Sequence, residues 1–207
     1  LEFRGRYLGI TVDILDVGYK DAIPTNGDIY LLGGAEDSAQ KLSLEALQKN
    51  MDTISAVIER GAVFLAVCAG FQILGNSFYA DGKEHRGLGL LNVDSIPGDK
   101  RYVGDIKVKY LGMDLELTGF ENHAGKTILG NGAQPLSKVE CGFGNGDGKF
   151  DGAMNGNIFG TYLHGPILAR NPEFADLLLN RAIGHKFTTF NDPVATKYAT
   201  WRRKVTK

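Results

Sequence analysis

The sequence predicts an α/β fold in which a mostly parallel central sheet carries helices on both faces. Runs of β-branched and other apolar residues, bounded by turn residues, predict strands at 10–15, 28–32 and 62–67. Between the last two runs, apolar residues recur every three or four positions over 41–60, which predicts one amphipathic helix ended by Gly61. Such alternation of strands and helices is typical of a parallel sheet that is covered on both faces.

The middle of the chain predicts an antiparallel section beside that sheet. A second helix follows the third strand and extends to about Phe78. Beyond Asp81, short strand candidates at 86–96, 103–110 and 114–120 are separated by Gly and Pro residues. This punctuation indicates antiparallel or mixed pairing of strands.

The strand–helix alternation returns near the C-terminus. A strand at 157–165 carries a histidine at its end. Asn171, as N-cap, and Pro172, as the first helical residue, begin a helix that runs to about Ile183. We expect the basic end of the chain, about residues 196–207, to be a solvated tail or a docking segment.

Length and composition favour a single domain over 1–207 in a reducing compartment. A chain of 207 residues can bury a substantial core without disulfides or metal. The net charge of −1 gives no indication of nucleic-acid binding, and no apolar run is long enough for a transmembrane segment. With two cysteines a disulfide framework is not expected, and the cytoplasm is the simplest location. Because the chain begins at Leu1 with what reads as the end of a helix, we expect a first strand of the domain to precede it.

The segment GAVFLAVCAGFQILG, residues 61–75, places a cysteine where a buried strand gives way to a helix. Small residues, Ala66 and Gly70, stand two positions before and after Cys68, as a tight strand-to-helix turn requires. The turn presents the side chain at the sheet edge, and the helix N-terminus favours the thiolate, the nucleophilic form of cysteine. A buried structural cysteine is the alternative, but it would not need small residues at both positions.

A candidate base stands at the end of another strand. His164 follows the apolar part of the strand at 157–165. In open α/β sheets, ligands bind at the carboxyl ends of the strands. Cys68 and His164 are therefore a candidate nucleophile and base, the alternative being an ordinary loop histidine.

Backbone donors for the same site are expected after the strand at 28–32. Gly33 and Gly34 follow this strand directly, so their amides can turn toward a ligand. Together with the N–H of Ala69 they could bind the oxygen of a tetrahedral intermediate, as an oxyanion hole does. On residue type alone, an ordinary Gly-Gly turn explains the pair equally well.

These stretches together resemble the class I (triad) glutamine amidotransferases, in the cobyric acid synthase-like branch. Within it the chain is similar to the GatD-type glutaminase subunits of lipid II isoglutaminyl synthase. The resemblance covers about 4–180 and rests on six segments in the same order: LLGGAEDSAQ, AVCAGFQILG, RGLGLL, KRYVGDI, GFENHAGKT and GTYLHGPILARNPE. It implies a flavodoxin-like class I glutaminase domain.

The resemblance also implies site residues. Cys68 would attack the side-chain amide of L-glutamine and form a glutamyl thioester, with His164 as general base and acid. Arg101, in KRYVGDI, matches a substrate-binding arginine, and a guanidinium suits the α-carboxylate because it can donate two parallel hydrogen bonds. A surface arginine on a loop is the alternative.

One departure from the wider class concerns the third member of the triad. Typical members carry an acid two residues beyond the histidine, whereas this chain has Pro166 there. The GatD-like branch therefore implies a Cys–His dyad, with Glu36 or Asp37 as candidate supporting acids. His123, in FENHAG, is a family-motif residue that we expect to shape the site.

The Gly-rich segment 141–152 does not fit a metal site. It offers Asn and Asp oxygens, but Gly156 stands at the twelfth position of a calcium loop, where glutamate is needed. We predict a hairpin or surface loop and no metal. Cys141 lies outside any elbow and is expected to be inert.

A separate partner follows from the resemblance. The chain has no P-loop and no room for an ATP-grasp or Mur-ligase domain, so no cofactor is expected on it. The implied partner is a MurT-type Mur ligase-like subunit, in a heterodimer, that uses ATP and magnesium to amidate the D-glutamate α-carboxyl of lipid II in peptidoglycan biosynthesis. Alternatives are ammonia supply to a cobyric acid synthase-type ligase, a partner-independent cysteine hydrolase and a binding module with an inactive site.

Overall fold

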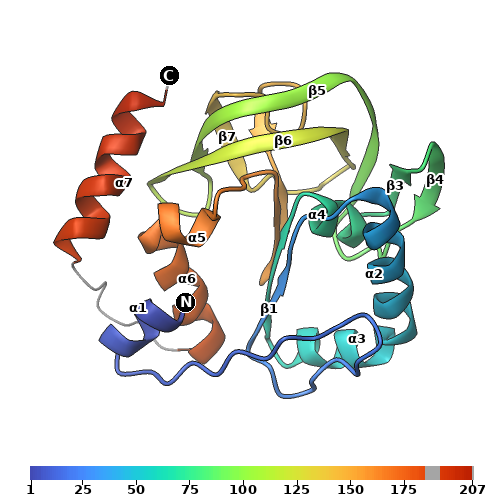
Figure 1. The fold of residues 1–207 in the computed structure, drawn as a ribbon, viewed down its shortest axis with the longest axis horizontal. Coiled ribbons are helices and arrows are strands. Elements are labelled where there is room, and N and C mark those ends of the chain that lie inside the picture. The colour runs from blue at the N-terminus through green and yellow to red at the C-terminus, as the bar shows by residue number, and fades with distance from the viewer. Residues whose placement is uncertain (185–191, 207) are drawn as a thin grey trace.

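The computed structural model describes residues 1–184 and 192–206, and it contains two sheets (Figure 1). The first sheet has the order β1-β2-β10-β9, in which the first three strands are parallel and β9 is antiparallel to β10. Its strands are short: β1 (Ile29–Leu32), β2 (Val63–Val67), β9 (Ala153–Asn155) and β10 (Ile158–Thr161). The predicted α/β fold with a parallel sheet is confirmed.

The second sheet is mostly antiparallel and contains the two long strands of the molecule. Its order is β4-β3-β5-β7-β8, with β6 paired to β5. Strands β5 and β6 arch together over the first sheet (Figure 1). Its strands are β3 (Ser77–Ala80), β4 (Lys83–Arg86), β5 (Val93–Tyr110), β6 (Leu115–Leu129), β7 (Ser137–Cys141) and β8 (Phe150–Asp151).

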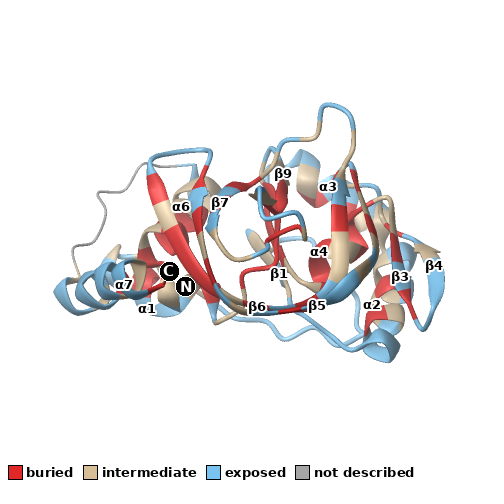
Figure 2. Cartoon of the chain, turned by 90° about the horizontal axis from the view of Figure 1, so that it is seen from above, coloured by how far each residue is buried: buried red, intermediate tan, exposed pale blue. Residues whose placement is uncertain are grey.

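Helices cover both faces of the first sheet, and two apolar clusters hold them there. One cluster joins Phe174 and Leu178 of α6 to β2 and β10, and the other joins Ile54 and Val57 of α3 to the opposite side of β2. Figure 2 shows that the buried residues concentrate on the strands and on the inner helix faces. The helices are α1 (Glu2–Tyr7), α2 (Asp37–Lys49), α3 (Met51–Glu59), α4 (Ala69–Leu74), α5 (Ile167–Arg170), α6 (Pro172–Ile183) and α7 (Pro193–Val205).

Two predictions for the N-terminal third were wrong. The segment 10–15 is not a strand, because no strand of the described part of the chain lies beside it, and Ile14 and Leu15 are exposed. The predicted helix over 41–60 is two helices, α2 and α3, which meet at Asn50. That residue leaves the helical conformation (φ −111°, ψ 20°) and its side-chain amide donates to the carbonyl of Ala46.

In the middle of the chain, strands extend further than the sequence pattern suggested. Helix α4 ends at Leu74, before the predicted end at Phe78, because β3 begins at Ser77. The candidate at 103–110 and the last four residues of the candidate at 86–96 fall on one continuous strand, β5, which has an irregularity between Pro97 and Tyr102. The rest of the candidate at 86–96 is not a strand, apart from Arg86 at the end of β4. Apolar alternation marks both ends of this strand but not its polar centre.

The C-terminal part confirms one helix and corrects the expected tail. Helix α6 begins at Pro172, but the side chain of Asn171 bonds to the backbone of Thr118 on β6 and does not cap the helix. Residues 193–205 form helix α7, which packs against β6, α5 and α6, so this segment is not a solvated tail. The side chain of Asp192 caps α7 by accepting two backbone N–H groups.

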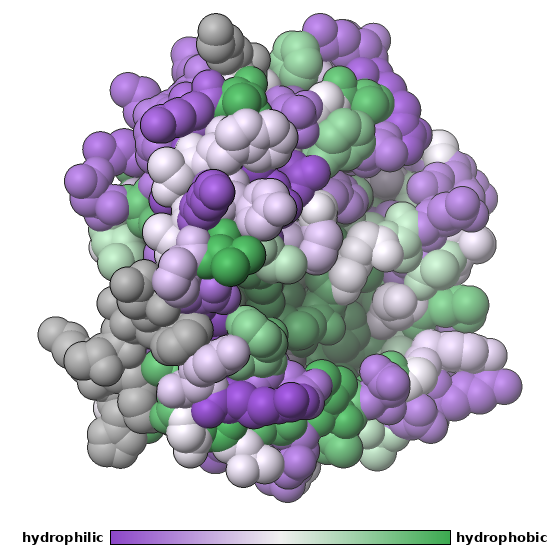
Figure 3. Space-filling model, turned by 60° about the vertical axis from the view of Figure 1, so that its left-hand side comes forward, coloured by the Kyte–Doolittle hydropathy of each residue, from purple (hydrophilic) through white to green (hydrophobic). Residues whose placement is uncertain are grey.

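The surface is mixed in character. Figure 3 shows a face with many hydrophilic side chains and with a hollow lined by apolar side chains near its middle. Among the described residues, no helix is both long and apolar enough to cross a membrane.

Candidate active site

Cys68 lies in a strained turn between β2 and α4. Its φ of 56° is in the left-handed region, which residues other than glycine rarely adopt. Strand β10 holds the turn on one side, since the N–H of Cys68 donates to the carbonyl of Thr161, the last residue of that strand, at 2.9 Å. On the other side Gly70 approaches the backbone closely: a Cβ there would lie 2.8 Å from the carbonyl oxygen of Leu32. The small residue predicted at this position is therefore needed for close packing.

His164 lies three residues beyond β10, at the junction of the two sheets. Its backbone forms an isolated antiparallel bridge with Phe120 of β6, with N–H···O distances of 2.9 and 3.1 Å. Strand β10 is the parallel neighbour of β2, so the side chain emerges at the same sheet edge as Cys68. The prediction that the strand itself ends in this histidine was wrong, because the chain leaves β10 after Thr161 to pair with β6.

Gly34 brings the two candidate groups into one space. A Cβ built on Gly34 would lie 3.3 Å from Cε1 of His164 and 3.5 Å from Cβ of Cys68. The imidazole and the thiol therefore both lie against this glycine, and a side chain at position 34 would occupy the gap between them. The neighbouring Gly33 accepts a hydrogen bond on its carbonyl from the N–H of Gly70, which ties the loop after β1 to the elbow.

The electrostatic setting favours an uncharged resting pair. Burial raises the pKa of the Cys68 thiol, against the N–H of Ala69 and the positive charge of Arg101, which both lower it. Burial also lowers the pKa of His164, and the nearby His123 lowers it further. A neutral imidazole beside a protonated thiol is the arrangement from which a base can take the proton at the moment of attack.

A cleft of about 770 Å³ opens beside the thiol. It is lined by six of the residues selected from the sequence, and Gly33, Gly34 and His164 lie outside its lining. The six are Glu36, Asp37, Cys68, Ala69, Arg101 and His123. The volume is in the range of small-molecule sites.

Arg101 extends from β5 at the rim of the cleft. Its Nε donates to Oδ1 of Asn122 on β6 at 2.7 Å, which fixes the plane of the guanidinium. Asn122 also lines the cleft, and the sequence analysis did not select it. The only signal for it was its place beside His123 in FENHAG.

The two candidate supporting acids both line the cleft but differ in their contacts. Glu36 is the N-cap residue of α2. Asp37 accepts the backbone N–H of Asp81 at 2.8 Å, so its carboxylate holds α2 against the β3–β4 turn. Pro166 is the N-cap residue of α5, a position from which it offers no acid to His164.

A buried polar chain beneath the cleft was missed by the sequence analysis. Gln40 donates to Gln72, Gln72 donates to the Tyr162 hydroxyl, and this hydroxyl meets Oγ1 of Thr127 at 2.7 Å. Burial raises the pKa of Tyr162 to about 12, so it stays a neutral donor and acceptor. Isolated polar residues in otherwise apolar segments, such as Gln72 in helix α4 and Thr127 in strand β6, were the only available signal.

The Gly-rich segment 141–152 joins two antiparallel strands, β7 and β8, as the predicted hairpin does. It is not purely a surface loop, because Asn145 is buried and exchanges hydrogen bonds with the backbone of Gly152. In the described part of the chain, no group of three or more His, Cys, Asp or Glu residues is placed to hold a metal ion.

Comparisons with known proteins agree with this geometry. Residues 9–172 match the CobB/CobQ-like glutamine amidotransferase domain. The chain is 36% identical, over 90% of its length and 74% of the relative, to the "lipid II isoglutaminyl synthase (glutamine-hydrolyzing) subunit GatD" of Streptococcus pneumoniae. It is 35% identical to the subunit of the same name from Staphylococcus aureus, over 92% and 78% of the two chains.

More distant relatives share the fold or part of the length. A probable cobyric acid synthase of Methanococcus maripaludis is 31% identical over 74% of this chain but only 33% of that protein. Among solved structures, a glutamine amidotransferase from Thermotoga maritima superimposes with a TM-score of 0.57 at 18% identity, over 99% of this chain and 85% of the other.

Proposed function

Since the chain belongs to the CobB/CobQ-like glutamine amidotransferase family, we propose that it is the glutamine-hydrolysing subunit of a lipid II isoglutaminyl synthase. The observation on which this proposal depends is that the side chains of Cys68 and His164 both lie next to Gly34. The family assignment supplies the reaction class, and the full-length similarity to two GatD subunits supports the substrate of the complex.

The first half of the reaction forms a thioester. His164 accepts the thiol proton, and the Cys68 sulfur attacks the side-chain carbonyl carbon of glutamine. The negative oxygen of the tetrahedral intermediate would be held by the N–H of Ala69 and by amides of Gly33 and Gly34. When the intermediate collapses, the carbon–nitrogen bond breaks and the leaving nitrogen takes the proton from His164 as ammonia departs.

The second half regenerates the enzyme. His164, neutral again, takes a proton from water as the water oxygen attacks the thioester carbonyl. The carbon–sulfur bond then breaks, the sulfur recovers a proton from the imidazolium, and glutamate leaves. A Cys–His dyad suffices because a thiol needs less help from an oriented base than a serine hydroxyl does.

Substrate binding is assigned to Arg101 at the rim of the cleft. The Arg101 guanidinium, oriented by Asn122, offers its outer N–H groups to the glutamine α-carboxylate. Glu36 and His123 border the same space and shape it around the rest of the amino acid.

The ammonia would be consumed by a second polypeptide. The proposed partner is a MurT-type Mur ligase-like subunit that uses ATP and magnesium to activate the D-glutamate α-carboxyl of the lipid II stem peptide. Ammonia is largely protonated at neutral pH, and the ammonium ion is not nucleophilic, so a closed route between the two sites is expected. This chain itself would carry no cofactor.

The proposal is tested by comparing two nitrogen sources in the reconstituted pair. We expect the chain, co-expressed with a Mur ligase-like subunit, to amidate lipid II with either glutamine or ammonium. Cys68→Ala should abolish the glutamine-dependent reaction and leave the ammonium-dependent one intact. Cys141→Ala is the matched control, since that thiol lies on β7 outside the cleft. Glutamine-dependent amidation by Cys68→Ala would refute the mechanism, and amidation of a corrinoid acid in place of lipid II would refute the substrate.

A further inference from the structure

Helix α7, at one edge of the molecule, carries an exposed apolar stripe (Figure 1). Four large side chains recur along its 13 residues at intervals of four, three and four positions, which is the spacing of one helix face. All four are more than half exposed: Val194, Tyr198, Trp201 and Val205. The buried residue of this helix is the small Ala199, and its packing is against β6, α5 and α6. The large apolar side chains are therefore left on the outside.

Positive charges border this apolar stripe on both sides. The helical repeat places Lys197 and Lys204 on one flank of the stripe and Arg202 on the other. Among the described residues no carboxylate pairs with any of these three, whereas Arg203 bonds to Glu173 of α6 at 3.0 Å. The helix itself contains no Asp or Glu. Its outer face therefore combines apolar side chains with positive charge that has no counter-charge in the described part of the chain.

Helix α2 shows how a helix of the same length differs when its outer face is solvated. Its 13 residues carry charges of alternating sign at intervals of four positions, a pattern that stabilises a helix in water. These charges belong to Asp37, Lys41, Glu45 and Lys49. Of its leucines, Leu42 is exposed, Leu44 is buried and Leu47 is half-buried. Exposure to water therefore does not explain the composition of the outer face of α7.

The chemistry of this face favours a lipid surface as its occupant. A second copy of α7 would bring the same cations against these ones, which is repulsive. Protein interfaces are depleted in lysine, whereas at a membrane a lysine lays its alkyl chain along the apolar surface and keeps its ammonium among the head groups. Tryptophan and tyrosine are enriched at the same boundary. Anionic head groups supply the counter-charge that Lys197, Arg202 and Lys204 lack within the described residues.

We propose that helix α7 docks the chain on an anionic phospholipid surface. A helix of 13 residues is too short to cross a bilayer, so it lies in the plane of the surface with its apolar stripe at the boundary between head groups and acyl chains. One such stripe is small, so the docking is reversible and needs both the apolar side chains and the flanking cations. This inference does not rest on the proposed function, for which it adds a position at the surface that holds a lipid-linked substrate.

Intrinsic fluorescence tests the docking directly, because Trp201 is the single tryptophan of the chain. We expect its emission to shift to shorter wavelength when vesicles of equal parts phosphatidylcholine and phosphatidylglycerol are added, and brominated acyl chains in these vesicles to quench it. Vesicles of phosphatidylcholine alone should produce a much smaller shift. An absent shift, or an equal shift with both vesicles, would overturn the proposal. A shift caused instead by concentrating the protein, or by a Mur ligase-like subunit without vesicles, would assign the face to a protein and overturn it as well.

The contribution of the flanking cations is measured by co-sedimentation with the same anionic vesicles. Lys197→Gln combined with Lys204→Gln should weaken binding about 30-fold, at about fivefold for each charge removed. Lys49→Gln combined with Lys83→Gln makes the same change in net charge at exposed positions of α2 and β4 and should leave binding unchanged. Equal weakening by the two pairs would show that net charge alone attracts the chain and would overturn the assignment to α7. Glutaminase activity measured without vesicles should be the same in both pairs, so failure of the docking is distinguishable from failure of the proposed function.

Discussion

The two sheets contribute to one cleft in different ways. The parallel sheet is made of short strands, and its contribution comes from the points where these strands end: the strained Cys68 after β2 and His164 beyond β10. The antiparallel sheet is dominated by β5 and β6, and it contributes from positions within or beside the long strands, such as Arg101 and His123.

This difference matches the demands on each group. Reacting groups must be exposed to the substrate, and the turns at the carboxyl ends of strands present side chains in this way. Groups that hold charge or orient other groups need fixed surroundings, and the ladder between β5 and β6 supplies them. We therefore expect changes on the first sheet to act on turnover, and changes on the second sheet to act on binding, charge state or stability.

The largest effect is expected at the end of β10. Replacing His164 by Ala removes the group that we propose takes and returns the thiol proton. We expect kcat for glutamine hydrolysis to fall by about 10³-fold, within the range typical of general acid–base groups. Steady-state glutamate release measures it, and His85→Gln, on β4, is the control. A variant that retains near-normal kcat would show that the two sheets do not divide the chemistry in this way.

A smaller effect, on stability alone, is expected at Asp151 of β8. Burial raises the pKa of this carboxyl to about 6 in the folded chain, against an ordinary 3.8. A raised folded pKa contributes stability that is fully present below the unfolded pKa and is lost as the pH rises through the folded one. The free energy of unfolding of the wild type should therefore fall by up to about 3 kcal/mol between pH 4 and pH 8 because of this group. In Asp151→Asn this pH-dependent fall should be absent.

Urea unfolding at several pH values measures this difference. Asp114→Asn is the control of opposite sign, because Lys109 lowers the pKa of the exposed Asp114 carboxyl. Parallel pH profiles for Asp151→Asn and the wild type would contradict the prediction.

The smallest effect is expected at the rim of the cleft. Arg101→Lys keeps the positive charge but loses the planar guanidinium that can bind a carboxylate through two bonds. We expect KM for glutamine to rise about tenfold, which corresponds to about 1.4 kcal/mol, with little change in kcat. Arg86→Lys on β4 should change neither constant. A fall in kcat without a rise in KM would show that Arg101 acts in turnover and not in substrate binding.

The sequence predicted the parts of the fold in which local pattern and tertiary packing agree. Helix α6 and strands β1 and β2 lie where apolar periodicity and turn residues put them. The segment 10–15 has a strand-like pattern but pairs with no strand among the residues that the structure describes, and hydrogen-bonded pairing is not encoded locally. The break at Asn50 was missed because the apolar spacing continues across it.

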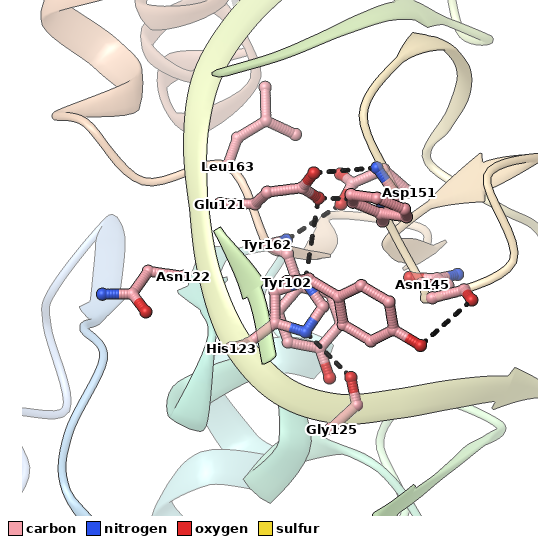
Figure 4. Close-up of polar contacts among 12 residues, drawn as sticks. Tyr102, Glu121, Asn122, His123, Gly125, Asn145, Asp151, Tyr162 and Leu163 are labelled. Carbon is pink, nitrogen blue, oxygen red and sulfur yellow. Dashed lines mark hydrogen bonds and ion pairs between the residues drawn. The ribbon is translucent and has the colours of Figure 1, made fainter. Parts of the chain in front are cut away.

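At the site, the strand ends were predictable and the buried supports were not. Small residues around Cys68 indicated the tight strand-to-helix turn, because that turn leaves no space for larger side chains. Glu121 and Asp151 carry no such local signal. Their partners, the backbone N–H groups of Phe143 and Gly144 and the Thr161 hydroxyl, are brought to them only by folding (Figure 4).

The bridge between Phe120 and His164 has a consequence for regulation of the reaction. In the described part of the chain, these two residues exchange the pair of main-chain hydrogen bonds that joins β6 to the segment after β10. Because of this bridge, a movement of β5 and β6 away from the parallel sheet would also move the imidazole of His164 away from the sulfur of Cys68. A molecule in which the two sheets have separated would therefore not hydrolyse glutamine, and hydrolysis would require the sheets to be packed together.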